Sequence, residues 1–217
     1  MTVPIPRIVT VRQNILKAND ATAAENRATF AAHGLRVLNL ASSPGAGKTA
    51  LLERTLKDLG QTLRLAVAVG DLATENDAVR LRQHGQAEQI VTGTVCHLDA
   101  AMIGAVLPRF DLPNLDVLLL ENVGNLVCPA SYDLGESARV VLLSTTEGED
   151  KPLKYPTIFN TADVVVVTKM DIAAAVDYDR ALALENIDRA RPGVRVIEVS
   201  SRTGEGLDAW YEFVRGR

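Results

Sequence analysis

The stretch LRVLNLASSPGAGKT, residues 35–49, decides the fold. Leu35–Ala41 is a short apolar run, and a loop rich in serine, proline and glycine follows it. Continuous rather than alternating hydrophobicity is typical of a strand that is buried on both faces. The next segment, Thr49–Leu59, is predicted to be a helix. A buried strand, a glycine-rich loop and a helix in this order indicate the first unit of a parallel α/β sheet.

The loop itself carries a phosphate-binding pattern. Ser42–Thr49 matches G-x-x-x-x-G-K-[ST], except that Ser42 stands where the first glycine is expected. The glycines allow successive N–H groups to face phosphate oxygens, and the positive end of the new helix adds to the attraction. Lys48 is expected between the β- and γ-phosphates, and the Thr49 hydroxyl is expected to ligate Mg²⁺. The predicted contacts to the nucleoside triphosphate are Ser43, Pro44, Gly45, Ala46, Gly47, Lys48, Thr49 and Ala50.

The same alternation of strand and helix continues along the chain. Further strands are predicted at 64–69, 88–91, 117–121, 140–144, 164–168 and 194–199, and helices at 11–34, 75–84, 97–106, 179–191 and 207–215. The pattern predicts an α/β protein with the P-loop NTPase fold, in which helices flank a mostly parallel sheet. We expect residues 1–34 to form an N-terminal helical extension and residues 35–217 a P-loop GTPase domain, within a single domain overall.

Composition excludes several classes of protein. The 217 residues include 23 Lys and Arg against 27 Asp and Glu, a formal net charge of −4, so neither nucleic acid nor an anionic membrane is expected as the main partner. No apolar run approaches the roughly 20 residues that span a bilayer. Two cysteines do not make a disulfide framework, and the first residues contain no apolar core of a signal peptide. We therefore expect a cytoplasmic protein.

Two later loops indicate that the base is guanine. The apolar run 164–168 leads into TKMD, Thr168–Asp171, and the run 194–199 leads into Ser200, Ser201 and Arg202. After a strand, the pattern [NT]KxD places an aspartate that accepts hydrogen bonds from guanine N1–H and N2–H₂, which adenine lacks. The predicted base-binding residues are Thr168, Lys169, Asp171, Ser200, Ser201 and Arg202.

Acidic residues follow two of the predicted strands. Glu121, in ENVG, is expected to hold a Mg²⁺-bound water, and Gly124 can turn its N–H toward the γ-phosphate. Asp71 is expected near the phosphates, where it would orient the attacking water or the metal; a helix-capping turn is an equal alternative. The predicted catalytic residues are thus Lys48, Asp71 and Glu121, and the predicted Mg²⁺ residues are Thr49, Asp71 and Glu121.

Soft metal ligands form a second constellation. Cys96 and His97 precede a predicted helix, whose N-terminus should favour the thiolate, and thiolate plus imidazole suits nickel or zinc. A buried cysteine beside a surface histidine is the simpler alternative for this pair alone. Cys128 supplies a third ligand if its loop lies near Cys96, and three ligands still fall short of a tetrahedral set. In a two-fold dimer, Cys96 and His97 from both chains would give four ligands around one shared ion, with Cys128 as a possible additional ligand.

These motifs together resemble one family, the HypB nickel-insertion GTPases of hydrogenase maturation. The resemblance rests on NLASSPGAGKT, GDLATENDAVRLR, GTVCHLDA, ENVGNLVCP and EGEDKPLKYP, with TKMD and SSRTGEG beyond them. It implies GTP-dependent dimerisation, GTP hydrolysis to GDP, and delivery of nickel to the hydrogenase large subunit with a HypA-type nickel metallochaperone. It also implies that Cys96 and His97 form a metal site at the dimer interface, with Cys128 as the neighbouring cysteine, and that zinc can occupy the same site.

The chain departs from many members of that family, because residues 1–30 contain neither cysteine nor histidine. We therefore expect no tight N-terminal nickel site. The alternatives left open are a urease-type nickel GTPase, a GTPase chaperone of another metalloenzyme such as a cobalamin enzyme, and a non-enzymatic metal-binding module. The segment Glu147–Pro156 is either a switch or dimer-contact loop or a solvated charged loop.

Overall fold

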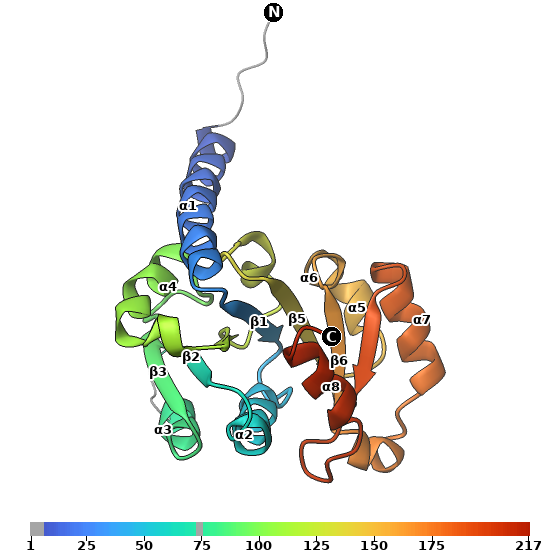
Figure 1. Cartoon of the computed structure of the whole chain (residues 1–217). Helices are drawn as coiled ribbons and strands as arrows, with labels where there is room; N and C mark the ends of the chain where they lie inside the picture. Colours follow the sequence, from blue (N-terminus) through green and yellow to red (C-terminus); the bar gives the residue numbers. More distant parts are fainter. Residues whose placement is uncertain (1–6, 73–75) are drawn as a thin grey trace, which may run out of the picture.

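Seven parallel strands form the centre of this computed structural model, which describes residues 7–72 and 76–217 (Figure 1). The strands lie in the order β3-β2-β4-β1-β5-β6-β7, and each adjacent pair is parallel. Their bounds are β1 (Arg36–Ser42), β2 (Leu65–Asp71), β3 (Gln86–Val91), β4 (Val117–Glu121), β5 (Ala138–Ser144), β6 (Val164–Thr168) and β7 (Arg195–Glu198). The predicted α/β architecture with a parallel sheet is confirmed.

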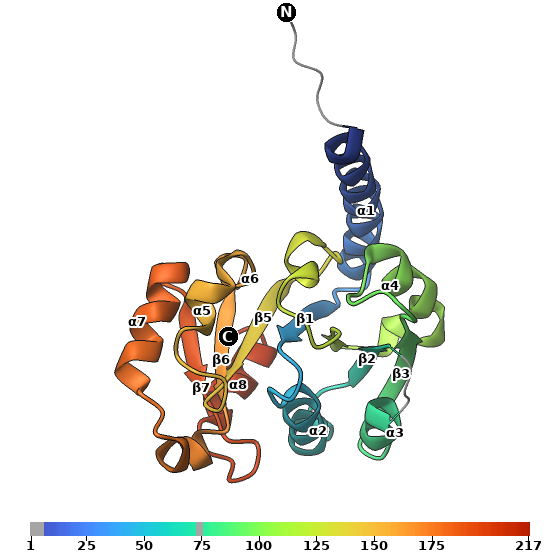
Figure 2. The same cartoon turned by 180° about the vertical axis from the view of Figure 1, so that it is seen from behind.

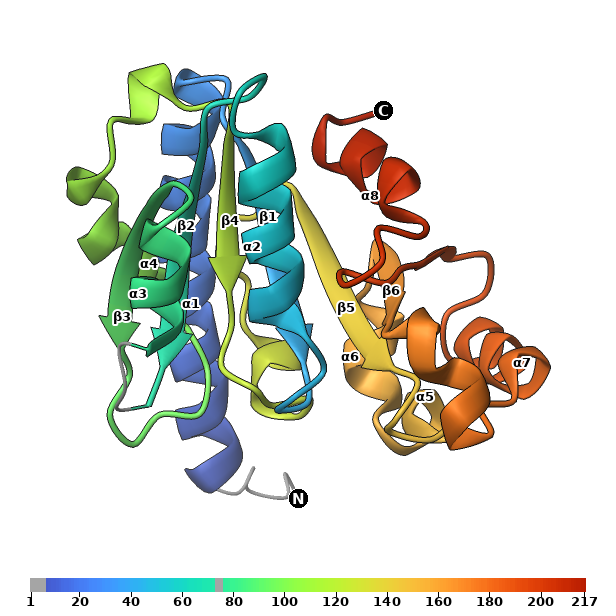
Figure 3. The same ribbon diagram turned by 90° about the horizontal axis from the view of Figure 1, so that it is seen from below.

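Helices cover both faces of the sheet. One face carries α2 (Lys48–Leu59), α3 (Asn76–Arg82) and α8 (Leu207–Val214), which share a core with alternate residues of the strands. The other face carries α1 (Arg7–Ala32), α4 (Ala100–Val106), α6 (Pro156–Asn160) and α7 (Arg180–Ala190). Figure 3 shows α2 and α3 in front of the strands and α1 behind them. Because both faces are covered, the inner strands β4 and β6 are apolar up to their last residue, whereas the edge strands β3 and β7 contain polar residues.

The short elements are α5 and four 3₁₀ helices, which lie in the connections. Their bounds are α5 (Lys151–Lys154), η1 (Leu107–Arg109), η2 (Leu112–Asn114), η3 (Cys128–Ser131) and η4 (Met170–Val176). Along the part of the chain that the structure describes, no helix combines the length and the apolar character needed to cross a membrane.

The carboxyl ends of the strands lie at one edge of the sheet, where a functional site is expected in an open α/β fold. β1 lies in the middle of the sheet, with β4, β2 and β3 on one side and β5, β6 and β7 on the other. The loop after β1 therefore begins at the position where the strand order changes direction. The last residues of β1, β2, β4 and β6 are Ser42, Asp71, Glu121 and Thr168. The topology therefore gathers the predicted nucleotide residues at this edge.

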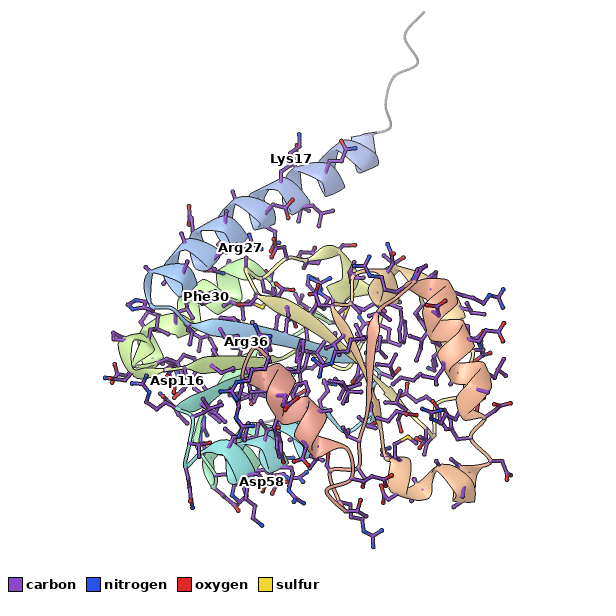
Figure 4. All side chains as sticks on the ribbon, turned by 45° about the vertical axis from the view of Figure 1, so that its right-hand side comes forward. Lys17, Arg27, Phe30, Arg36, Asp58 and Asp116 are labelled. Atoms are coloured by element: carbon purple, nitrogen blue, oxygen red, sulfur yellow. The ribbon has the colours of Figure 1, made fainter. Side chains whose placement is uncertain are left out.

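The N-terminal helix stands partly clear of the rest of the molecule. Figures 1 and 2 show α1 running from the sheet toward the N-terminus, and Figure 4 shows Lys17 on its projecting part and Phe30 at its base. The observed helix, Arg7–Ala32, lies close to the predicted one at 11–34. The first six residues of the expected extension lie outside the described residues. The division into an extension and a GTPase domain stays a prediction.

Two expectations of local structure are wrong. The helix predicted from His97 begins only at Ala100, because Asp99 is its N-cap and accepts a hydrogen bond from the Met102 N–H. The segment after β5, for which no helix was predicted, contains α5 and α6, each with a proline in its first turn. Proline is favoured there because the first N–H groups of a helix have no partner within the helix. Glu75, the predicted start of the helix at 75–84, lies outside the described residues.

Candidate functional site

The phosphate loop joins β1 to α2 and depends on two glycines. Gly45 and Gly47 have φ angles of 73° and 94°, in the left-handed region that other residues rarely adopt. Gly124, which follows β4, lies against this loop from the other side: a Cβ at this position would come within 3.0 Å of Pro44 Cα. The close approach holds the phosphate loop next to the segment that follows Glu121.

Lys48 is buried at the base of the loop and has one side-chain hydrogen bond. Its ammonium group donates to the Ser42 hydroxyl at 2.8 Å, and that hydroxyl donates in turn to the Ser43 carbonyl. Only 7% of Lys48 is exposed, and burial lowers its pKa from the ordinary value. Ser42, which stands at the first glycine position of the pattern, thus holds the Lys48 side chain in place through this hydrogen bond.

Glu121 lies beside Thr49 in a buried position. The Thr49 hydroxyl donates to Glu121 Oε1 at 2.7 Å, whereas Oε2 is buried and has no hydrogen-bond partner among the described residues. Burial raises the pKa of Glu121 to about 7. A hydroxyl and an unpartnered carboxylate oxygen are hard oxygen donors of the kind that Mg²⁺ takes. The residues present therefore fit the predicted magnesium site.

A pocket of about 460 Å³ lies over the phosphate loop. It is lined by the predicted residues Lys48, Thr49, Asp71, Glu121 and Gly124. The Asp71 carboxylate also accepts a hydrogen bond from the adjacent Leu72 N–H. This contact belongs to a turn, as in the alternative role of Asp71 as a helix-capping turn residue. Sequence reasoning assigned no site role to six further residues of the lining, which are Gly70, Leu72, Asp77, Arg80, Asn122 and Val123. The motif GDLATENDAVRLR contains Asp77 and Arg80 but assigns them no role, because they come from α3 and reach the pocket only through the fold.

The predicted base-binding loops adjoin the phosphate loop. The Thr168 hydroxyl donates to the Ala46 carbonyl at 2.6 Å, and Lys169 has a left-handed backbone with φ of 61°. Asp171 accepts a 2.7 Å hydrogen bond from the Ser200 hydroxyl, and Arg202 lies 3.9 Å from the same carboxylate. The residues predicted from TKMD and from the loop after β7 therefore meet, although 29 positions separate Asp171 from Ser200.

Cys96, His97 and Cys128, hereafter the Cys–His–Cys group, also come together. One donor atom from each lies within 4.8 Å of the other two, and the Cys96 thiol donates to Cys128 Sγ at 3.0 Å. Among the described residues this is the one cluster of three or more such side chains that could hold a metal ion. The simpler alternative, an isolated buried cysteine beside a surface histidine, does not describe this geometry.

The expected activation of Cys96 by a helix N-terminus is wrong. α4 begins at Ala100, beyond the cysteine, and the hydrogen bond with Cys128 is the main cause that raises the Cys96 pKa. His97 packs against Tyr132 with ring centroids 3.9 Å apart, and burial lowers the His97 pKa. Its Nδ1 is buried without a hydrogen-bond partner among the described residues. A neutral imidazole with an unpartnered nitrogen is the form that ligates metals.

Two asparagines connect the nucleotide pocket to the Cys–His–Cys group. The Asn122 carbonyl oxygen accepts from the Leu98 N–H at 3.1 Å, directly after His97. Asn125 donates to the Cys96 carbonyl at 3.1 Å. Both asparagines belong to the segment that runs from Glu121, at the nucleotide pocket, to Cys128. The segment between the nucleotide pocket and Cys128 therefore contacts the main chain on both sides of His97.

Comparison with known proteins agrees with this arrangement. Residues 36–198 match the family described as CobW/HypB/UreG, nucleotide-binding domain. Hydrogenase maturation factor HypB of Azotobacter vinelandii is 50% identical over 209 residues, which are 96% of this chain and 69% of that protein. The chain belongs to the HypB family. The HypB of Escherichia coli K12 is 46% identical, over 96% of this chain and 72% of the relative.

Two solved HypB structures share the fold. The crystal structure of HypB from Helicobacter pylori in complex with nickel has a TM-score of 0.85 and 41% identity, covering 90% of this chain and 93% of that one. HypB from Archaeoglobus fulgidus has a TM-score of 0.86 and 39% identity, covering 92% and 98%. The resemblance inferred from the sequence and the P-loop fold are both confirmed. The roles of individual site residues stay predictions.

Proposed function

We propose that this chain hydrolyses GTP and carries nickel during maturation of [NiFe]-hydrogenase. GTP draws two copies together, the Cys–His–Cys groups hold the ion at the interface, and hydrolysis relaxes the contact. The observation that carries the proposal is the meeting of Cys96, His97 and Cys128 within 4.8 Å, at the end of a segment that begins in the nucleotide pocket. Membership of the HypB family supports the same conclusion.

In this proposal the phosphate loop and its neighbours hold and activate the nucleotide. Lys48 leaves Ser42 to contact the β- and γ-phosphates, and Asp171 accepts hydrogen bonds from the guanine edge. Thr49, Glu121 and Asp71 hold Mg²⁺, which neutralises charge on the phosphates when bound. Glu121 would act there as a carboxylate, although burial raises its pKa to about 7 in the nucleotide-free protein. Asp71 also orients the attacking water.

Nickel is the cargo of the Cys–His–Cys group. Thiolates and imidazole favour nickel and zinc over magnesium, so zinc can occupy the same position. One chain offers three such donors, which leaves a four-coordinate set incomplete. In a two-fold dimer, Cys96 and His97 from both copies make up the four ligands, and Cys128 of each copy lies beside them. Val127, next to Cys128, is 63% exposed and offers apolar surface for that contact.

The nucleotide can release nickel only if the two states of the protein hold the ion with different affinity. The contacts of Asn122 and Asn125 support such a difference, because both lie between the phosphate pocket and the metal ligands. We infer that the cargo passes to the hydrogenase large subunit with the help of a HypA-type nickel metallochaperone, in the cytoplasm.

Two variants test the proposal. Lys48→Ala should abolish phosphate release from GTP, whereas Lys57→Ala, on the exposed side of α2, should leave it unchanged. Cys96→Ala should remove nickel binding and spare the binding of GDP and GTP. Nickel affinity that survives in Cys96→Ala, or GTP turnover that survives in Lys48→Ala, would refute the corresponding assignment.

A second candidate cargo acceptor is urease. A relative from Helicobacter pylori, 41% identical over 95% of this chain, is named hydrogenase/urease maturation factor HypB. The same nucleotide and nickel chemistry serves either acceptor. Nickel transfer from the loaded protein to each purified apoenzyme distinguishes the two.

A further inference from the structure

Two buried asparagines of α1 lie against the loops that carry the metal ligands. Asn19 and Asn26 are 9% and 5% exposed. They are seven positions apart, about two helical turns, and therefore lie on the same face of α1. A buried amide side chain needs hydrogen-bond partners, and these two find them outside their own helix.

Asn19 bridges the two ligand loops. Its carbonyl oxygen accepts from the Ala100 N–H at 2.9 Å, three residues after His97. Its amide group donates to the Asp133 carbonyl at 2.8 Å, five residues after Cys128. One side chain thus fixes the distance between the loop of Cys96 and His97 and the loop of Cys128.

Asn26 makes a second bridge between the same loops. Its amide group donates to the Ala100 carbonyl at 2.8 Å and to the Leu134 carbonyl at 3.2 Å. Ala100 is therefore held by α1 at both its N–H and its carbonyl group. Because the side chains of Asn19 and Asn26 bond directly to buried main-chain groups, they constrain backbone position more closely than apolar packing would.

The second loop is shaped to approach α1. Gly135 has φ of 90°, and a Cβ there would lie 2.7 Å from the Ala23 carbonyl oxygen. Only glycine fits so close to the helix backbone. Asn19 and His97 also border the same hollow of about 370 Å³. The N-terminal helix is thus part of the wall beside His97, although it supplies no member of the Cys–His–Cys group.

We propose that Asn19 and Asn26 are positioning residues for the Cys–His–Cys group: α1 clamps the two ligand loops so that the thiols and the imidazole converge. The significance of the clamp for nickel rests on the proposed function. Its geometric effect does not, because the spacing of the two thiols is a property of the metal-free protein.

The test compares Asn19→Ala, Asn26→Ala and the double variant with Phe30→Leu. Phe30 is buried at the base of α1 in the hydrophobic core, so its truncation weakens helix packing without removing either bridge. Phenylarsine oxide, which bridges two nearby thiols, is added to the metal-free 217-residue proteins. Reaction with a reagent that needs one thiol serves as the reference. Nickel affinity and GDP affinity are then measured on wild type and the same four variants.

The clamp predicts slower dithiol capture in the asparagine variants, with single-thiol reactivity retained. It also predicts nickel binding that is weaker by about 10- to 100-fold, the usual effect of removing a residue that orients metal ligands, with unchanged GDP affinity. Phe30→Leu should match wild type in both. The clamp would be overturned if the double variant captured the dithiol reagent at the wild-type rate. It would also be overturned if Phe30→Leu, with an equal loss of stability, slowed dithiol capture and weakened nickel binding to the same extent. If wild type binds no nickel, the proposed function fails, and dithiol capture still decides the clamp.

Discussion

Glu121 should make the nucleotide-free protein less stable as pH rises, and Glu121→Gln should remove this effect. The pKa of this buried carboxyl is raised from 4.5 to about 7, so the folded state keeps the proton over a pH range in which the unfolded state has lost it. Stability contributed by this group is therefore full below about pH 4.5 and is lost as pH rises to about 7. At pH 8 the loss amounts to about 3 kcal/mol. Glutamine stays neutral and can still accept from Thr49 Oγ1.

Urea unfolding of the two proteins at pH 5, 6, 7 and 8, in a chelator and without nucleotide, measures this difference. Near pH 5 wild type and Glu121→Gln should have nearly equal unfolding free energies, and the variant should gain on wild type as pH rises. Groups that titrate in both proteins cancel in the comparison. Glu185→Gln, an exposed acid of α7, is the matched control and should follow wild type at every pH. A difference between wild type and Glu121→Gln that stays constant from pH 5 to pH 8 would refute the reasoning.

Three further predictions concern other parts of the fold. Asp171→Asn should lower the preference for GTP over ATP by at least about tenfold, measured by competition binding; an unchanged preference would exclude Asp171 as the guanine-reading residue. Gly124→Ala should fold normally but lower GTP turnover at least about tenfold, because its Cβ would meet Pro44; wild-type turnover would show that the close approach is dispensable. Arg139→Met should reduce the unfolding free energy by about 3 to 5 kcal/mol, since it leaves the buried Glu136 carboxylate without its 2.9 Å ion pair; a loss below about 1 kcal/mol in urea melts would contradict this.

Local patterns were sufficient to find the seven strands of the described chain, whereas the roles assigned to the nucleotide loops stay predictions. β4 and β6 occur at the predicted residues, because an unbroken run of buried Val and Leu fits no other element of that length here. The predicted helix at 97–106 is too long at its N-terminal end. The apolar pattern extends ahead of the true start, and the capping hydrogen bond of Asp99 makes Ala100 the first helical residue. Helix ends depend on single side-chain hydrogen bonds, which periodicity does not contain.

The metal-ligand geometry could be predicted only in part. The sequence identifies Cys96, His97 and Cys128 as soft ligands, but the 32 positions between the two cysteines are closed by the fold alone. Asn19 and Asn26 were not singled out, because a lone asparagine on a helix is ordinarily a surface residue. Their partners are main-chain N–H and carbonyl groups, which nearly every residue type has. The sequence at the partner positions therefore does not reveal these hydrogen bonds.

The most direct test of the account is a nickel titration of the purified protein, once with GDP and once with a non-hydrolysable GTP analogue, while light scattering follows the mass. We predict about half an ion per chain, bound together with dimer formation, and an affinity that differs between the two nucleotides. Absence of nickel binding in both states, or a full ion per chain in a protein that remains monomeric, would contradict a nucleotide-switched nickel carrier.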